Sequence, residues 1–170
     1  MDQTTATPIA FLDAYAPAQI AMRVREVGVA KAAMPVLTMF ALAVLAGAFI
    51  ALGALFFTVT MTRGATGQSP AFGLMRLAGG ITFSVGLILV VVGGAELFTG
   101  NNLIAMAWAS GRVTTQQIMR NWGWVYLGNL IGAVGTAALV WLAGIQSMGD
   151  GAVGETMVQI ARSKIALDPV

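Results

Sequence analysis

The chain has 170 residues, of which 58% are hydrophobic and only 9% are charged, and its formal net charge is +2. Soluble domains carry about 25% charged residues, so this composition excludes an ordinary water-exposed surface and favours a membrane protein. The sequence contains no cysteine and no histidine, so we expect no disulfide, no metal site, no cofactor and no enzymatic nucleophile–base pair. Its basic residues are spread along the chain and form no nucleic-acid patch.

Residues 1–31 are predicted to be a polar tail followed by an amphipathic helix on the membrane surface. From residue 9 onward, apolar and charged residues alternate with helical spacing. Ile20 and Val27 share one face with other apolar residues, whereas Lys31 points elsewhere. Pro17 is expected to start the main part of this helix, because the first helical turn tolerates proline. The acidic N-terminus does not resemble a cleaved signal peptide.

A transmembrane half-domain is predicted over residues 32–149. Its three apolar spans cover residues 32–62, 71–109 and 115–144, each long enough for a bilayer core of ~30 Å. Residues 150–170 are mixed and polar, and we expect them to form an external segment leading to a fourth span that this sequence does not contain.

Small residues and a capping signal indicate how the spans pack. Ala43 and Gly47 in the first span, and Gly128 and Gly132 in the third, are small residues four apart, which lets helices approach closely. Thr114 is a plausible N-cap for the third span.

The second span is interrupted near residues 93–101, within the sequence GGAELFTGNNL (93–103). An unbroken helix from Leu77 to Ala109 would be roughly 50 Å long at ~1.5 Å per residue, far more than a bilayer requires. The only charged side chain in that stretch is Glu96. A glycine-interrupted apolar segment that holds one acid indicates a permeation or binding site, because bare backbone at membrane depth must line a cavity or be buried in protein.

The break suggests roles for its polar residues. A half-helix beginning near Gly100 would direct free N–H groups toward an anion, and Thr99 would cap that half-helix or offer its hydroxyl to a solute. Glu96, Gly100 and Asn101 are interpreted as loop-structuring residues. Glu96 is expected either to be neutral through desolvation or to accept hydrogen bonds from backbone N–H groups, with a proton relay or cation site as the functional alternative. Asn101, Asn102 and Asn129 are expected to make interhelical hydrogen bonds.

The same motifs carry a resemblance to a known family. The stretch GGAELFTGNNL, the pattern N-W-x-x-V-Y-x-G-N at residues 121–129, KAAMP at 31–35 and residues 72–92 together resemble the formate/nitrite transporter family. The resemblance covers nearly the whole chain from about residue 8 onward. It implies an all-α membrane protein with an aquaporin-like architecture of two inverted three-helix repeats, each with a broken second helix. It also implies a homopentamer in which every subunit conducts small monovalent anions such as formate, nitrite or hydrosulfide.

The resemblance also assigns residues to a substrate pathway. Phe83 resembles the outer constriction aromatic, and Leu87 and Leu97 resemble the inner constriction leucines. Phe98 and Thr99 belong to the same pathway, with the Thr99 hydroxyl between the constrictions. Family members have six spans, and the second broken helix, second aromatic and central histidine have no counterpart in this sequence. The resemblance therefore implies either a truncated chain or a half that pairs with another half.

Three functions remain open from the sequence. The leading one is a channel or transporter for small monovalent anions. A non-transporting membrane fragment or scaffold that needs a second half is the first alternative. An aquaporin-like pore for neutral solutes is the second, although no Asn-Pro-Ala motif is present.

Basic residues favour a cytoplasmic N-terminus in the cell membrane. The positive-inside rule places the side richer in lysine and arginine in the cytoplasm. In a three-span arrangement the N-terminal side holds Arg23, Arg25, Lys31, Arg112 and Arg120, and the opposite side holds Arg63, Arg76, Arg162 and Lys164.

Overall fold

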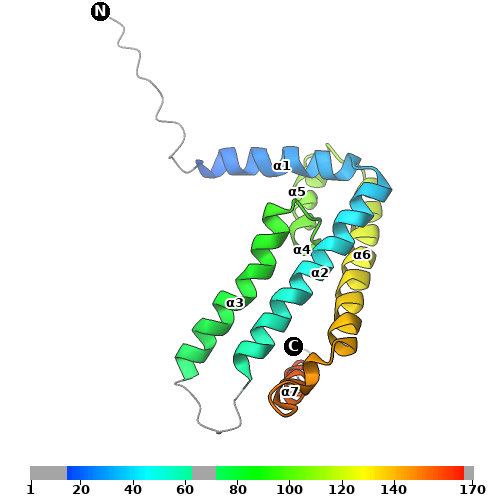
Figure 1. Ribbon diagram of the computed structural model, residues 1–170. Coiled ribbons are helices and arrows are strands. Elements are labelled where there is room, and N and C mark those ends of the chain that lie inside the picture. Colours follow the sequence, from blue (N-terminus) through cyan, green and yellow to red (C-terminus); the bar gives the residue numbers. More distant parts are fainter. Residues whose placement is uncertain (1–14, 63–71, 167–170) are drawn as a thin grey trace, which may run out of the picture.

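A computed structural model describes residues 15–62 and 72–166 of the chain. The elements in these ranges are helical, and three of the helices are long and apolar enough to cross a membrane. The predicted polar tail at residues 1–8, the predicted turn at 63–70 and the last residues of the chain lie outside the described ranges. Figure 1 shows the membrane-capable helices side by side, with a further helix across one end of the bundle.

The helix across the end of the bundle is α1 (Pro17–Ala33), and Pro17 is its first residue, as predicted. The chain then bends at Met34 and Pro35, which have extended backbone angles, before α2 begins at Val36. The guanidinium of Arg120, from the third span, donates hydrogen bonds to the backbone carbonyls of Ala32 (2.8 Å) and Met34 (3.0 Å). These bonds satisfy carbonyls that the end of α1 leaves without a helical partner.

The first span, α2 (Val36–Met61), packs closely against the third span, α6 (Thr115–Leu142). A Cβ atom on Gly47 would lie 2.1 Å from the backbone oxygen of Asn129, and one on Gly132 would lie 2.0 Å from that of Val44. The glycines at the predicted close-packing positions therefore let the two backbones touch. Thr114 accepts a hydrogen bond from the Gln117 N–H (3.2 Å) and caps α6, as predicted.

The second span begins with α3 (Phe72–Val92), which packs on the other side of α2. Gly53 of α2 and Gly86 of α3 face each other, since a Cβ atom on either would lie 3.0 Å from the Cα atom of the other. The remaining surface of α3 is largely apolar and exposed, which suits lipid or a further protein wall rather than water.

The break in the second span is confirmed, but it ends earlier than predicted. The α3 helix stops at Val92, Gly94 adopts a left-handed conformation (φ +60°), and helical structure resumes at Phe98 rather than near Gly100. The downstream half is also interrupted, with α4 (Phe98–Asn101) and α5 (Ile104–Ala109) separated by a turn. The asparagine pair at 101 and 102 therefore lies at a second interruption that the hydropathy pattern did not reveal.

At the opposite end of the bundle, residues 145–165 form a short 3-10 helix, η1 (Ile145–Ser147), and an amphipathic helix, α7 (Ala152–Ile165). The mixed composition of this segment did not indicate a helix. Val153 is the buried residue of α7, and the helix packs against the end of α2 (Figure 1).

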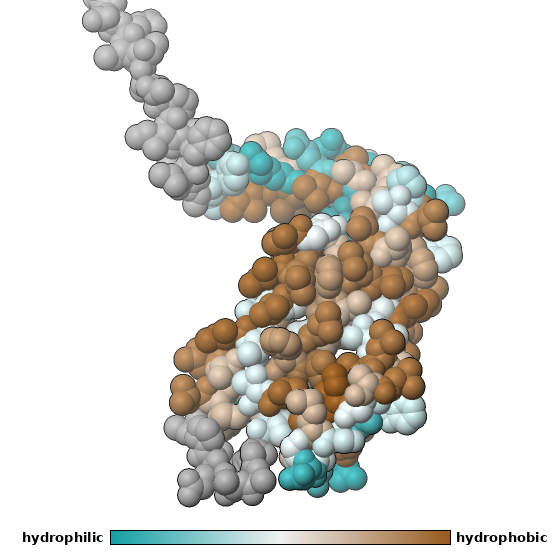
Figure 2. All heavy atoms as spheres, in the orientation of Figure 1, coloured by the Kyte–Doolittle hydropathy of each residue, from teal (hydrophilic) through white to brown (hydrophobic). Residues whose placement is uncertain are grey.

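The hydrophobic residues are arranged as in a membrane protein rather than a water-soluble one. Buried positions are mostly small or medium side chains between the helices, such as Ala43, Ala46 and Val125, whereas many large apolar side chains lie on the outer surface. Figure 2 shows the outer surface of the spans as predominantly hydrophobic, and α1 as hydrophilic on the side away from the bundle. The α1 helix therefore has the position and polarity expected at a membrane surface.

We expect Gly132→Ala to lower the stability of the protein. The added Cβ would overlap the Val44 carbonyl of α2, and backbone cannot move aside as a flexible side chain can. Overpacking of this kind costs about 1–3 kcal/mol, so thermal unfolding in mild detergent should occur at a lower temperature. Gly135→Ala is the matched control on the same helix, because nothing lies within 4 Å of its Cβ position. Equal melting temperatures for the two variants would contradict this packing argument.

Candidate functional site

The break in the second span forms one wall of a cavity of about 620 Å³ that lies beneath α1 and beside α3. A cavity at this depth lets water or a solute reach the unpaired backbone of an interrupted helix. Its lining includes Arg23 and Lys31 from α1, Leu87 from α3, and Glu96, Leu97, Thr99, Gly100 and Asn101 from the break.

Glu96 and Lys31 form an ion pair at the edge of this cavity. The Lys31 Nζ lies 2.6 Å from Glu96 Oε1, and the exposed fractions of the two side chains are 24% and 4%. Lys31 Nζ also donates to Asn101 Oδ1 at 3.1 Å, and Asn101 Nδ2 donates to Glu96 Oε2 at 2.7 Å. The three side chains therefore form a closed triangle in which both carboxylate oxygens accept hydrogen bonds.

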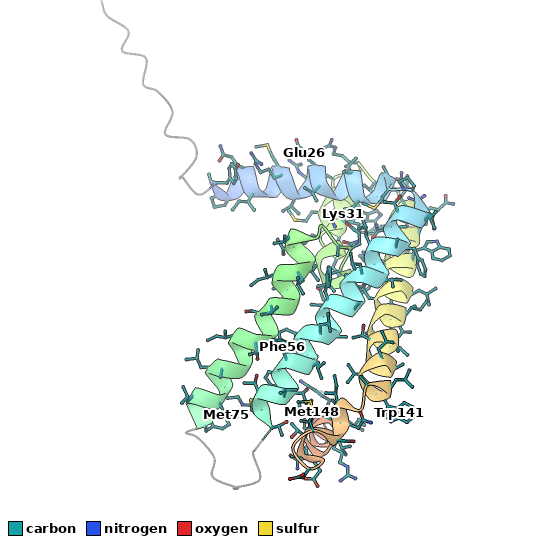
Figure 3. All side chains as sticks on the ribbon, viewed as in Figure 1. Glu26, Lys31, Phe56, Met75, Trp141 and Met148 are labelled. Carbon is teal, nitrogen blue, oxygen red and sulfur yellow. The ribbon has the colours of Figure 1, made fainter. Side chains whose placement is uncertain are left out.

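This arrangement corrects two predictions from the sequence. The Glu96 carboxylate is held by side chains of Lys31 and Asn101, whereas backbone N–H groups were expected to hold it. Lys31 was expected to point away from the apolar face of its helix, yet it turns toward the break (Figure 3). The physical reason is that an isolated carboxylate at membrane depth is costly, and a cation from the end of α1 is within reach.

Asn121 of α6 extends the network to the first span. It is fully buried, as is Asn101, and its Oδ1 accepts a hydrogen bond from Asn101 Nδ2 at 2.9 Å. Its own Nδ2 donates to the backbone carbonyl of Lys31 at 3.2 Å and contacts the sulfur of Met39. Trp122 adds a bond from its indole N–H to the carbonyl of Asn101 (3.1 Å). Buried polar groups are thus satisfied where α1, α4 and α6 meet.

Thr99 and Gly100 are exposed at the cavity, but neither starts the downstream half-helix. Leu97 occupies the N-cap position of α4 without a side-chain capping bond, so the prediction that Thr99 is the cap is wrong. The N–H group of Phe98 already donates to Asn129 Oδ1 at 2.9 Å. The break therefore offers fewer free N–H groups near Gly100 than expected. The Thr99 hydroxyl lines the cavity and can act there as a hydrogen-bond donor.

The predicted pathway residues are only partly brought together. Leu87 and Leu97 both line the cavity, Leu87 from α3 and Leu97 from the break itself. Phe83 lies one helical turn before Leu87 on α3 and does not line the cavity, although it is half exposed. The ring of Phe98 packs edge-on against the rings of Trp122 (centroid distance 6.4 Å) and Tyr126 (5.5 Å), so it contributes to the packing of α4 against α6.

The charges around the cavity favour anions. Its charged lining residues are Arg23, Lys31 and Glu96, so two cations and one anion leave a net charge of +1. Neither basic residue was predicted from the sequence to belong to the site. Lys31 could have been found from Glu96, because a charged side chain within the membrane is usually paired with an opposite charge and Glu96 is the only acid of the second span. Within the described residues, no cluster of acidic side chains could hold a metal ion.

Comparison with known proteins agrees with this geometry. The formate/nitrite transporter family model matches residues 18–170. The chain is 46% identical over 153 residues to the formate channel FocA of Escherichia coli (strain K12), a match that covers 90% of this chain and 53% of FocA. It is 44% identical over 120 residues to FocA of Haemophilus influenzae, covering 71% and 41% of the two chains.

A solved structure described as a pentameric formate channel with formate bound has the same fold. It superimposes with a TM-score of 0.68 at 39% identity, covering 78% of this chain and 51% of that one. The chain spans about half the length of the curated relatives it matches. From the broken second span, the cavity beside it and these matches, we conclude that the chain belongs to the formate/nitrite transporter family.

Proposed function

We propose that this chain forms one wall of a transmembrane pathway for small monovalent anions, with formate as the first candidate. The observation that carries the proposal is the cavity at the break, where Arg23 and Lys31 outnumber Glu96 and the Thr99 hydroxyl is exposed. A cation excess in a largely apolar site attracts a small anion, and a hydroxyl replaces part of its hydration shell. Nitrite and hydrosulfide, which the family resemblance implies, are the next candidates.

Leu87 and Leu97 are proposed to narrow the pathway on either side of Thr99. Both are apolar, and both face the cavity from separate segments. Apolar constrictions stop water and ions unless the solute fits and is briefly stabilised. Phe83, one turn farther along α3, is proposed as the outer constriction, which would extend the pathway beyond the cavity.

A second wall must complete this pathway. In the described structure Phe83, Leu87 and Thr99 are exposed, and the cavity that Leu87 and Thr99 line is open on one side. We propose that three further spans, arranged as an inverted repeat, supply this wall and that the complete subunits assemble as a pentamer. The pentameric formate channel that shares the fold supports this assembly. A chain without the second wall would serve only as a scaffold or fragment.

The proposed orientation has a cytoplasmic N-terminus. Arg112 lies in the turn before α6, and Arg120 bonds to the end of α1, so both lie at the same end of the bundle as the basic residues of α1. Arg76 of α3 and the basic residues of α7 lie at the opposite end (Figure 1). The slightly larger basic group marks the cytoplasmic side by the positive-inside rule.

In a channel completed by three further spans, we expect Thr99→Val to slow formate flux into proteoliposomes by about two- to tenfold, because a net hydrogen bond is worth about 0.5–1.5 kcal/mol. The substitution keeps the side-chain shape and removes the hydroxyl. Thr60→Val is the matched control, since Thr60 is exposed on α2 and bonds only to the carbonyl of Phe56 in its own helix.

The test of the function itself uses the unmodified chain co-expressed with a polypeptide that supplies three further spans of the same family, and this completed channel is the parent for every flux measurement. Saturable formate uptake that exceeds the permeability of empty liposomes supports an anion pathway. Uptake of glycerol without formate would instead favour a neutral-solute pore, and the absence of both would favour a scaffold. Unchanged flux in Thr99→Val, with normal flux in the parent, would remove Thr99 from the pathway.

A further inference from the structure

Asn129 of α6 hydrogen-bonds to two backbone groups of the break. It belongs neither to the Lys31–Glu96 ion pair nor to the lining of the cavity. Its Nδ2 donates to the carbonyl of Glu96 at 2.9 Å, and its Oδ1 accepts from the N–H of Phe98 at 2.9 Å. Nδ2 also donates to the carbonyl of Ala43 in α2 at 2.8 Å. One amide therefore joins the first span, the third span and the interrupted second span.

Only one orientation of the amide satisfies all three bonds. The oxygen must face an N–H group and the nitrogen must face two carbonyls, and an amide has one acceptor and two donor hydrogens for this purpose. The close approach of α2 and α6 makes the geometry possible, because Gly47 leaves the backbone of Asn129 in direct contact with α2. A larger residue at position 47 would move Asn129 away from Ala43.

The two bonds to the break lie on either side of Leu97. Leu97 has an extended backbone (φ −93°, ψ 131°), and Glu96 before it and Phe98 after it are both held by Asn129. The neighbouring side chains are anchored independently, Glu96 by Lys31 and Phe98 by aromatic contacts. Leu97 itself packs against the cluster that contains Ala46 and lines the cavity.

We propose that Asn129 is a positioning residue that sets the place of Leu97 in the pathway, and thereby the size of anion that passes. This inference rests on the proposed function for its selectivity, because Leu97 is the proposed inner constriction. Asn129 itself is not among the residues that line the cavity, so its effect on transport must act through the backbone at residues 96–98. A backbone clamp of this kind fixes a constriction more precisely than side-chain packing alone.

Removing the clamp should widen the constriction rather than close it. In Asn129→Leu, which is similar in size, the Phe98 N–H and the Glu96 carbonyl lose their partner in a nonaqueous environment. Both groups then gain by moving toward the cavity, where water and the charged side chains of its lining can pair with them, and Leu97 moves with them. The channel should admit larger monovalent carboxylates that the parent excludes.

The first measurement is the ratio of formate flux to acetate flux in proteoliposomes that contain equal amounts of assembled protein. We expect the ratio to fall severalfold in Asn129→Leu and to stay at the parent value in Thr136→Val. Thr136 is the matched control because it lies on the same helix and bonds only to the carbonyl of Gly132 within it. A merely structural role would change the amount of assembled protein and leave this ratio unchanged.

The second measurement does not depend on transport. The sequence contains no cysteine, so Leu97→Cys introduces a single thiol that a water-soluble maleimide can label. Adding Asn129→Leu should accelerate labelling by about tenfold, which corresponds to about 1.4 kcal/mol. Adding Thr136→Val should leave the labelling rate unchanged.

These two measurements separate failure of the inference from failure of the proposed function. A parent channel that does not conduct formate even when three further spans complete it would refute the proposed function, while the labelling rates would still test the clamp. Equal labelling rates with and without Asn129→Leu would overturn the inference, as would an unchanged flux ratio in a conducting protein. If Asn129→Leu does not assemble, Asn129→Asp replaces it, because aspartate keeps the acceptor for Phe98 and loses the amide donors. The same outcomes then apply.

Discussion

Replacing Glu96 by alanine is expected to prevent stable assembly of the protein. The substitution leaves the Lys31 ammonium without its carboxylate and the Asn101 amide without one of its acceptors, both in a partly or fully buried position. Removing one partner of a buried ion pair costs about 3–5 kcal/mol, since the other charge remains buried without compensation. That loss is a large share of the 5–15 kcal/mol by which a typical folded domain is stable.

Thermal unfolding and size-exclusion chromatography in mild detergent measure this effect. Glu155→Ala is the control, because Glu155 is an exposed acid in the first turn of α7. Lys31→Met combined with Glu96→Leu should recover much of the stability, because an apolar pair of similar volume removes both charges together. A Glu96→Ala protein that assembles normally and shows an altered pH profile of formate flux would favour the proton-relay interpretation instead.

The second large effect concerns the 170 residues by themselves. We expect this polypeptide, expressed without any other chain, not to conduct formate selectively as a single copy. The cavity beside the break is bounded by α1, α3 and the break itself, and Thr99 and Gly100 are exposed there. In a bilayer those groups would meet lipid unless protein covers them, and each unsatisfied backbone group in hydrocarbon costs several kcal/mol. The expected results are aggregation, degradation or association with a second copy.

Expression of residues 1–170, purification in mild detergent and flux measurements in liposomes test this expectation. Mass determination in detergent distinguishes a single copy from a self-associated form. A monodisperse single copy with saturable formate flux would refute the prediction and would show that one wall is sufficient. Co-expression with a polypeptide that holds three further spans of the same family is the positive control.

Much of the architecture could be predicted from the sequence because the bilayer restricts the choices. Long uncharged stretches must be helical where lipid surrounds them, and a stretch too long for one crossing that contains glycines and an acid must be interrupted. Pro17, Thr114 and the glycine pairs act through contacts within a helix or between adjacent helices. Local chemistry therefore predicted the start of α1, the cap of α6 and the positions through which α2 and α6 pack closely, whereas the pairing of these two helices came from the structure.

The partners of the polar residues were decided only by the tertiary structure. Hydropathy indicates that Glu96 is costly at its depth, but it does not reveal that Lys31, 65 positions earlier, turns inward to pair with it. The start of α4 is likewise set from outside the segment, because Asn129 on another helix binds the Phe98 N–H. Such pairings depend on where α1 and α6 cross the break in space, and periodicity along one helix carries no information about that crossing.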